Sequence, residues 1–253
     1  MKRRCLIPVL LPLLIISLAE GASPNPTQLI LESERQTLGD STSSTVKLSV
    51  SHGGNPRKMR FKFWSSQRDK AVIKVMEPAK DRDTGNLRLN LDLWEYLPNI
   101  ERTIKVPTSM LLQSWMGSDF SNDDLVKTTS LSHDYTHQLV GHEKQGGYDT
   151  YKILCIPKPN APIAWGKVLI WLTTTGSAPV RQEFYNDKGE LVKILKCSQL
   201  KRFGSHIVPT VLEMSVPKKG IWSTTFQYES LAFDKPLSDT IFTQEFLRRP
   251  IQK

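Results

Sequence analysis

The chain has 253 residues, of which 39% are hydrophobic and 8% are aromatic. These proportions are typical of a folded globular protein and exclude a disordered or fibrous chain. The formal net charge is +9, but the basic residues are scattered along alternating segments such as RKMRFKFW at 57–64. This pattern indicates a solvated outer face, or one that attracts anionic head groups or an acidic partner, rather than a nucleic-acid site.

The first nineteen residues have the pattern of an export signal. Three basic residues at positions 2–4 precede an apolar run at 6–18, and Ser17 and Ala19 supply the small residues of a cleavage site. The run is short for a membrane span, so we expect cleavage after Ala19 rather than an uncleaved anchor. No cysteine stands just after the apolar run, which disfavours a lipid-modified N-terminus. We expect residues 20–253 to form a single domain.

The mature chain begins with an amphipathic helix and continues as strands. The sequence predicts a helix from Thr27, as its cap, to Leu38, with Gly39 ending it. Alternating apolar residues and turn residues then predict strands at 42–50, 59–63, 71–78, 87–97, 100–106, 148–156, 167–174, 180–185, 191–200, 208–216 and 221–233. A short capped helix is expected at 238–247. Such spacing predicts a curved, mainly antiparallel β sheet with a few helices.

The central stretch 85–127 organises the chain. Alternation of Leu87, Leu89, Leu91 and Leu93 with polar residues predicts four leucines on one face of a strand. Pro107 ends the last strand of the stretch. A short apolar segment, residues 110–116, and a turn at 117 follow.

A helix start is predicted directly after that turn. Ser121 precedes Asp124 by three residues, which is the spacing of a helix cap. Asp119, Asp123 and Asp124 would also suit a cation site or an acid–base pair. Helix capping and charge placement at the helix start are the simpler interpretation of the three carboxylates.

Histidine and cysteine residues are further candidates for a metal site or a disulfide. His133 and His137 are four residues apart, but no glutamate lies between them as in a zinc-binding helix, so surface histidines are the simpler interpretation. Cys155 and Cys197 could pair in an oxidising compartment or lie separately in the core. No nucleophile elbow, metal signature or phosphate loop is visible. The sequence therefore predicts no enzyme, cofactor or metal site.

Two motifs carry a family resemblance. LWEYLPNIER (93–102) is followed by SWMGSDFSNDDL (114–125), and KVMEPAKDRDTG, HDYTHQLVG, PVRQEFYNDKGELVK and IFTQEFLRR fall in the expected order. The chain resembles the outer-membrane lipoprotein-sorting (LolA-like) periplasmic protein family, in its longer branch with W-x-Y-L-P and G-S-D-F motifs. The resemblance implies an unclosed β-barrel whose concave side is covered by helices.

The resemblance also implies a function. It implies a periplasmic carrier or chaperone, in a Gram-negative-type envelope, that shields a lipid or lipoprotein acyl chain in a hydrophobic cavity during transport towards the outer membrane. Relatives often work beside RND-type exporters, which implies an inner-membrane partner, and we expect a monomer. The shorter lipoprotein carriers of this family use a lid-closing arginine; here only the positions of Arg60 and Arg102 along the chain, and no motif, suggest a counterpart.

The apolar segment supplies the candidate site. Methionine and aromatic side chains in a loop suit a plug or a movable lid, and each buried methylene of a ligand contributes roughly 0.8 kcal/mol. Ligand contact and plain core packing both remain open for these residues. The candidate cavity or lid residues are Trp94, Tyr96, Leu111, Leu112, Trp115, Met116 and Phe120. The alternative function is an envelope interaction protein that binds no lipid and associates with an inner-membrane exporter.

Overall fold

The computed structural model describes residues 23–66, 69–122, 124, 131–159, 161, 165–220 and 222–251. The expected signal peptide and Asp123 lie outside these residues, so both expectations stay predictions. Among the described residues, no helix is long and apolar enough to cross a membrane.

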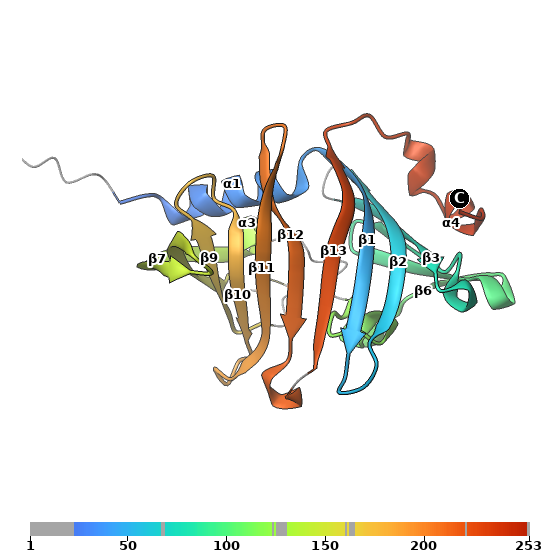
Figure 1. Ribbon diagram of the computed structural model, residues 1–253, viewed down its shortest axis with the longest axis horizontal. Helices are drawn as coiled ribbons and strands as arrows, with labels where there is room; N and C mark the ends of the chain where they lie inside the picture. Colours follow the sequence, from blue (N-terminus) through green and yellow to red (C-terminus); the bar gives the residue numbers. More distant parts are fainter. Residues whose placement is uncertain are drawn as a thin grey trace, which may run out of the picture.

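Thirteen strands form one antiparallel sheet, in the order β6-β5-β4-β3-β2-β1-β13-β12-β11-β10-β9-β8-β7 (Figure 1). The first and last strands pair at its centre, and β6 and β7 form its two open edges, which confirms the predicted unclosed antiparallel sheet. The strands are β1 (Ser41–Ser51), β2 (Arg57–Ser66), β3 (Lys70–Glu77), β4 (Gly85–Leu89), β5 (Asp92–Leu97), β6 (Arg102–Lys105), β7 (Tyr135–Gln145), β8 (Tyr148–Pro157), β9 (Lys167–Thr173), β10 (Pro179–Tyr185), β11 (Leu191–Phe203), β12 (His206–Ser215) and β13 (Ser223–Phe233).

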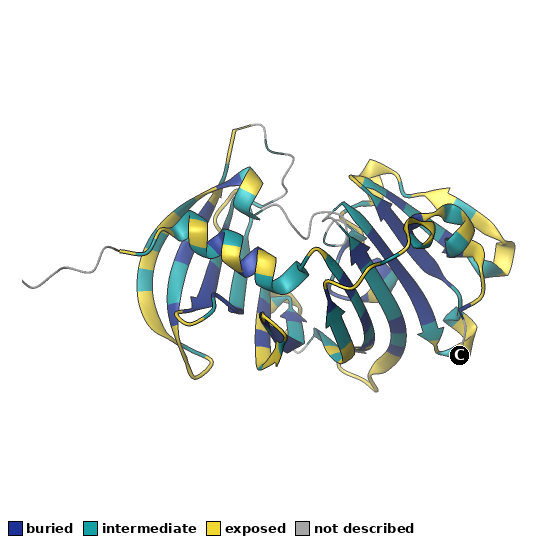
Figure 2. Cartoon of the chain, turned by 90° about the horizontal axis from the view of Figure 1, so that it is seen from above, coloured by how far each residue is buried: buried dark blue, intermediate teal, exposed yellow. Residues whose placement is uncertain are grey.

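Helices lie on both faces of this sheet. Helix α1 contacts both β7 and β12, which have four strands between them, so those strands must curve around the helix. Figure 2 shows from above how these strands curve around α1. The described helices are α1 (Pro26–Leu38), α3 (Leu131–Asp134) and α4 (Gln244–Arg248), with 3₁₀ turns η1 (Ala79–Asp81), η2 (Pro98–Ile100), η3 (Thr108–Met110), η4 (Trp115–Gly117), η5 (Pro217–Lys219) and η6 (Asp239–Phe242).

The convex face of the β2–β5 region is covered by the C-terminal segment. Residues that pair directly across strands share a face, and Trp64, Val72 and Leu87 form one such row. These side chains pack with Phe242 and Leu247 of the segment. Gly85 permits the close approach, because a Cβ there would lie 2.7 Å from Leu247 Cδ1 and 3.1 Å from the backbone oxygen of Ile73.

Three local predictions need correction. The cap of α1 is Asn25, two residues before the predicted Thr27, because the helix begins at Pro26; the Asn25 side chain accepts from the backbone of Thr27. The expected helix at 238–247 is divided into η6 and α4, since Thr243 is extended and caps the second of them.

The prediction of one strand with four leucines on the same face is also wrong. Asn90 adopts a φ of 54°, which turns the chain into a hairpin between β4 and β5. Leu91 is therefore 65% exposed at the turn. Leu87 and Leu93 face opposite sides of the sheet, because Leu87 pairs with Trp94 and Leu93 pairs with Arg88.

Candidate functional site

Two cavities lie on the concave face, on either side of the C-terminal end of α1. The first has a volume of about 220 Å³ and is lined chiefly by β1–β5, β12 and β13. The second has a volume of about 240 Å³ and is lined chiefly by α1 and β9–β12. Thr37, Leu38, Pro209 and Leu212 border both cavities, so the end of α1 separates them. Each volume is below the roughly 300–1,000 Å³ that is usual for ligand pockets.

Both cavities have mainly apolar walls. Phe63, Ile73 and Leu93 line the first, and Ile170 and Phe184 line the second. The alternation of each strand places these side chains inward, while charged residues such as Lys58 and Lys62 point out. The concave face can therefore take up apolar groups without a large loss of polar hydration.

The end of α1 is fixed by a histidine. His206 on β12 has Nδ1 2.9 Å from the Gln36 backbone oxygen and Nε2 2.7 Å from Asp234 Oδ2. Both partners are acceptors, so each ring nitrogen faces an oxygen that can accept a hydrogen bond from it. The hydrogen bond from His206 also holds the pKa of Asp234 below its usual value. The partition between the cavities is thus tied to β12 and to the end of β13.

A tryptophan plug covers the concave face beside the first cavity. Trp115, in η4, is 1% exposed and packs among Val46, Leu48 and Phe61. Its ring is edge-on to Phe61 at 5.7 Å and stacked on Phe226 at 6.3 Å. The indole Nε1 donates to Asn86 Oδ1 at 2.9 Å, and Asn86 itself lines the first cavity. The plug is thereby joined to the cavity wall through one side-chain hydrogen bond.

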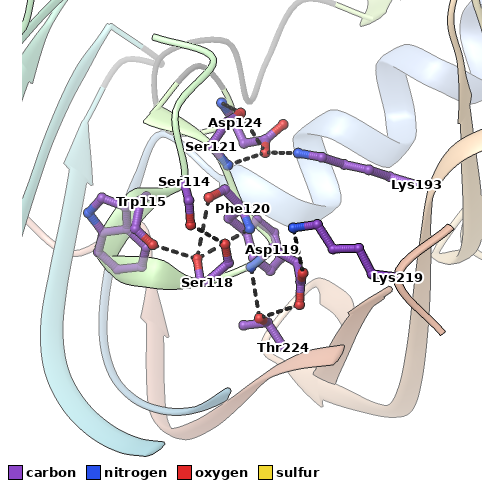
Figure 3. A network of polar contacts seen from close by, with 10 residues as sticks. All are labelled: Ser114, Trp115, Ser118, Asp119, Phe120, Ser121, Asp124, Lys193, Lys219 and Thr224. Atoms are coloured by element: carbon purple, nitrogen blue, oxygen red, sulfur yellow. Dashed lines mark hydrogen bonds and ion pairs between the residues drawn. The ribbon is translucent and has the colours of Figure 1, made fainter. Parts of the chain in front are cut away.

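A compact turn holds this plug on the sheet (Figure 3). Met116 and Gly117 have φ values of 50° and 68°, so the chain reverses there. The Ser118 backbone N–H then donates to the Trp115 oxygen at 2.9 Å, and the Trp115 N–H donates to the Phe120 oxygen at 2.7 Å. These bonds close the turn on itself and present the indole ring to the sheet.

Asp119 attaches the turn to β13. Its backbone N–H donates to Thr224 Oγ1 at 2.9 Å, and the Thr224 hydroxyl donates to Asp119 Oδ2 at 2.8 Å. The Asp119 side chain has no exposed surface, and the basic side chains beside it are His52, with Nε2 at 3.8 Å, and Lys219, with Nζ at 4.0 Å. Asp119 therefore anchors the plug and does not cap a helix.

Ser121 and Asp124 form the predicted cap. The Ser121 N–H donates to Asp124 Oδ2 at 2.7 Å, and the Asp124 N–H donates to Ser121 Oγ at 3.2 Å. This is the reciprocal geometry of a capping box. Lys193 Nζ on β11 lies 2.7 Å from the same carboxylate oxygen, so the box also fastens this segment across the second cavity.

The structure places the candidate residues in three settings. Met116 packs beside Trp115, and Phe120 lines the second cavity and lies edge-on to Phe226 at 4.5 Å. Leu111 is half-buried, and Leu112 is 68% exposed. Trp94 and Tyr96 pack in the convex-face cluster with the C-terminal segment, so they face away from both cavities.

Sequence reasoning missed Arg88 and Asn86. Both lie on β4 and line the first cavity, because the C-terminal segment packs on the leucine face of this strand and leaves the opposite face to the hollow. The sequence signal that could have shown this is Gly85 before the LRLN segment and Asn90 at its end, because both residues are common in turns. Arg60 and Arg102 lie elsewhere: Arg60 pairs with Glu229 at 2.5 Å on the outer face, and Arg102 is exposed on the edge strand β6.

The cysteines and histidines have structural settings. Cys155 and Cys197 are free and buried, and burial raises the pKa of both thiols to about 12. His137 lies between Thr27 Oγ1 at 3.0 Å and the Leu131 backbone oxygen at 2.8 Å, which joins α1 to α3. No group of three potential metal ligands occurs among the described residues.

This arrangement defines a class of protein: a curved, unclosed sheet with a helix across its hollow and small apolar cavities behind a plug. Solved structures that share the fold include the following three. A DUF1329 family protein from Desulfovibrio piger has a TM-score of 0.81 and 24% identity, over 88% of this chain and 97% of that one. A domain described as a candidate outer membrane lipoprotein-sorting protein from Vibrio parahaemolyticus has a TM-score of 0.78 and 21% identity, over 88% and 98%. A LolA superfamily protein from Nitrosomonas europaea has a TM-score of 0.74 and 21% identity, over 88% and 100%.

The fold is therefore the LolA-like fold, and the resemblance found in the sequence is confirmed. A family model described as "uncharacterized protein" matches residues 67–249, which is more than half of the chain, so the chain belongs to that family. No curated protein matches the sequence.

Proposed function

We propose that the protein is a periplasmic carrier that shields an acyl chain of a lipid or lipoprotein on the concave face of its sheet. The observation that supports this most is the pair of apolar-walled cavities beside a plug that is linked to the cavity wall by the bond from Trp115 to Asn86. An acyl chain needs no polar anchor, because each buried methylene contributes roughly 0.8 kcal/mol.

The plug gives the proposal a mechanism. Each cavity is smaller than an ordinary ligand pocket, so a long chain requires more room than either offers. If Trp115, Met116 and Phe120 moved away from the sheet, the space that they vacate would connect with the first and second cavities. In this proposal the three side chains fill the hollow when the cargo is absent and line it when the cargo is bound.

The experiment is native mass spectrometry of residues 20–253, purified without detergent from a bacterial periplasm, followed by organic extraction. We expect a co-purifying or added acylated molecule to be bound, and to be lost in the W115S/M116S variant. The matched control, W94S, removes a tryptophan from the convex face and should keep the ligand. An unchanged apo mass after incubation with lipids and acylated peptides would contradict the carrier, and crosslinking to membrane proteins would then test the interaction-protein alternative.

A further inference from the structure

The first cavity contains one buried cation. Arg88 on β4 lines the cavity and is 5% exposed, in a wall that is otherwise built largely from apolar side chains. The other charged residue of the wall is Asp40, which is exposed at the end of α1. A guanidinium keeps its proton in proteins, so Arg88 places a positive charge inside the cavity.

Two small hydroxyl side chains, Ser65 and Thr42, lie in the same cross-strand row as this cation. In the register of the sheet Arg88 pairs with Ala71, Ala71 with Ser65, and Ser65 with Thr42, so their side chains share the concave face. All four residues line the first cavity. The neighbouring row contains Asn86, Ile73 and Phe63. The cavity therefore offers one cation and a few uncharged polar groups among walls that are otherwise mainly apolar.

Burying the charge of Arg88 in a mainly apolar wall costs free energy of solvation. Burial lowers the pKa of Arg88, and the charge of Asp69 opposes that shift. Charged side chains are rarely buried to this degree unless they are paired or functional. A guanidinium carries five N–H donors in a planar fork, so it can serve a protein carboxylate on one edge and a ligand oxygen on another.

We propose that the first cavity is a site for an acyl chain with an acidic head group. Arg88 binds the head group, and the apolar side chains of the cavity wall pack against the chain. This inference rests on the proposed carrier function and narrows its cargo. The shared chemistry is a carboxylate or phosphate oxygen attached to a hydrocarbon chain, as in a fatty acid or an anionic phospholipid. A neutral ligand of equal chain length packs against the same apolar side chains but offers Arg88 no acidic oxygen.

The test compares matched ligands on the mature protein by isothermal titration calorimetry. Dodecanoate is compared with dodecanol, and short-chain phosphatidylglycerol with the phosphatidylcholine of equal chain length, all below their aggregation concentrations. We expect the acidic member of at least one pair to bind about tenfold more tightly, as charge-assisted hydrogen bonds allow. The pair that shows the preference identifies the head group. Equal affinity within both pairs overturns the proposal while leaving the carrier function intact, whereas absence of binding by all four ligands overturns both.

Variants locate the preference. R88M should bind the neutral ligands as the wild type does and lose the preference for the acid, while R88K should keep part of it. K58M, which removes a positive charge from the exposed outer end of β2, is the charge-matched control and should keep the full preference. A preference that persists in folded R88M overturns the assignment to Arg88. If R88M does not fold, R88K and the wild-type ligand pairs decide the question.

Discussion

The two faces of the β1–β5 half of the sheet are both covered by aromatic residues, but in different ways. On the convex face, Phe242, Phe246 and Leu247 of the C-terminal segment pack against strand residues in one apolar cluster. On the concave face, Trp115 is held by a closed turn, by Asp119 and by one bond to Asn86, with cavities beside it. The convex cover is held by apolar packing, whereas the concave cover combines apolar packing of Trp115 with a small set of polar contacts, which in the proposed function are broken when cargo binds.

The largest effect is expected on the convex face. Leu247 has no exposed surface and contacts the backbone at Gly85. L247A should lower the free energy of unfolding by about 2–5 kcal/mol, through lost burial and the cavity it leaves. Urea unfolding measures the loss, and ligand affinity of the folded fraction should not change. A change in affinity of the folded fraction would show that the two covers are coupled.

A smaller and more local effect is expected at the plug. D119A leaves the Thr224 hydroxyl without its buried acceptor and should cost about 1–3 kcal/mol. D119N retains an oxygen that accepts from Thr224, so it serves as the control and should cost less. Hydrogen exchange of residues 114–121 should quicken in D119A and stay close to wild type in D119N. Equal exchange in the two variants would mean that Asp119 does not anchor the turn.

The smallest effect concerns the end of α1. The pKa of Asp234 is lowered by its hydrogen bond from His206, so the folded state binds that proton less readily than the unfolded state. The stabilisation is present above the unfolded pKa, near 3.9, and is lost as the pH falls through the folded value. In D234N the acid-induced loss of stability should be smaller than in the wild type. Identical acid unfolding profiles for the two proteins would mean that Asp234 does not contribute to the pH dependence of stability.

The sequence predicted the sheet well and the faces of its strands poorly. Alternation and turn residues identify antiparallel strands because their signals are local. The sequence analysis placed Trp94 and Tyr96 at the cavity, but they lie on the convex face. One residue, Asn90, determines whether β4 and β5 form one strand or a hairpin, and therefore which face these two side chains occupy. The face that each side chain occupies then depends on the curvature of the whole sheet, which no local pattern encodes.

The candidate site was predicted in part for the same reason. The Trp115 segment was recognised because apolar residues in a loop must pack on something, and the capping box at Ser121 is a local motif. Arg88 was missed because alternating strands normally place arginine in solvent. It faces inward because the C-terminal segment, more than 150 residues further along the chain, covers the opposite face of β4, and no local pattern predicts that contact.

The central claim is that cargo displaces the concave cover and leaves the convex cover in place. The most direct measurement is hydrogen exchange of residues 114–121 and of 241–247, with and without saturating dodecanoate or phosphatidylglycerol. The account predicts faster exchange at 114–121 on binding, because the turn leaves Thr224 and Asn86, and unchanged exchange at 241–247. Binding that leaves 114–121 unchanged, or that affects both segments equally, would contradict it.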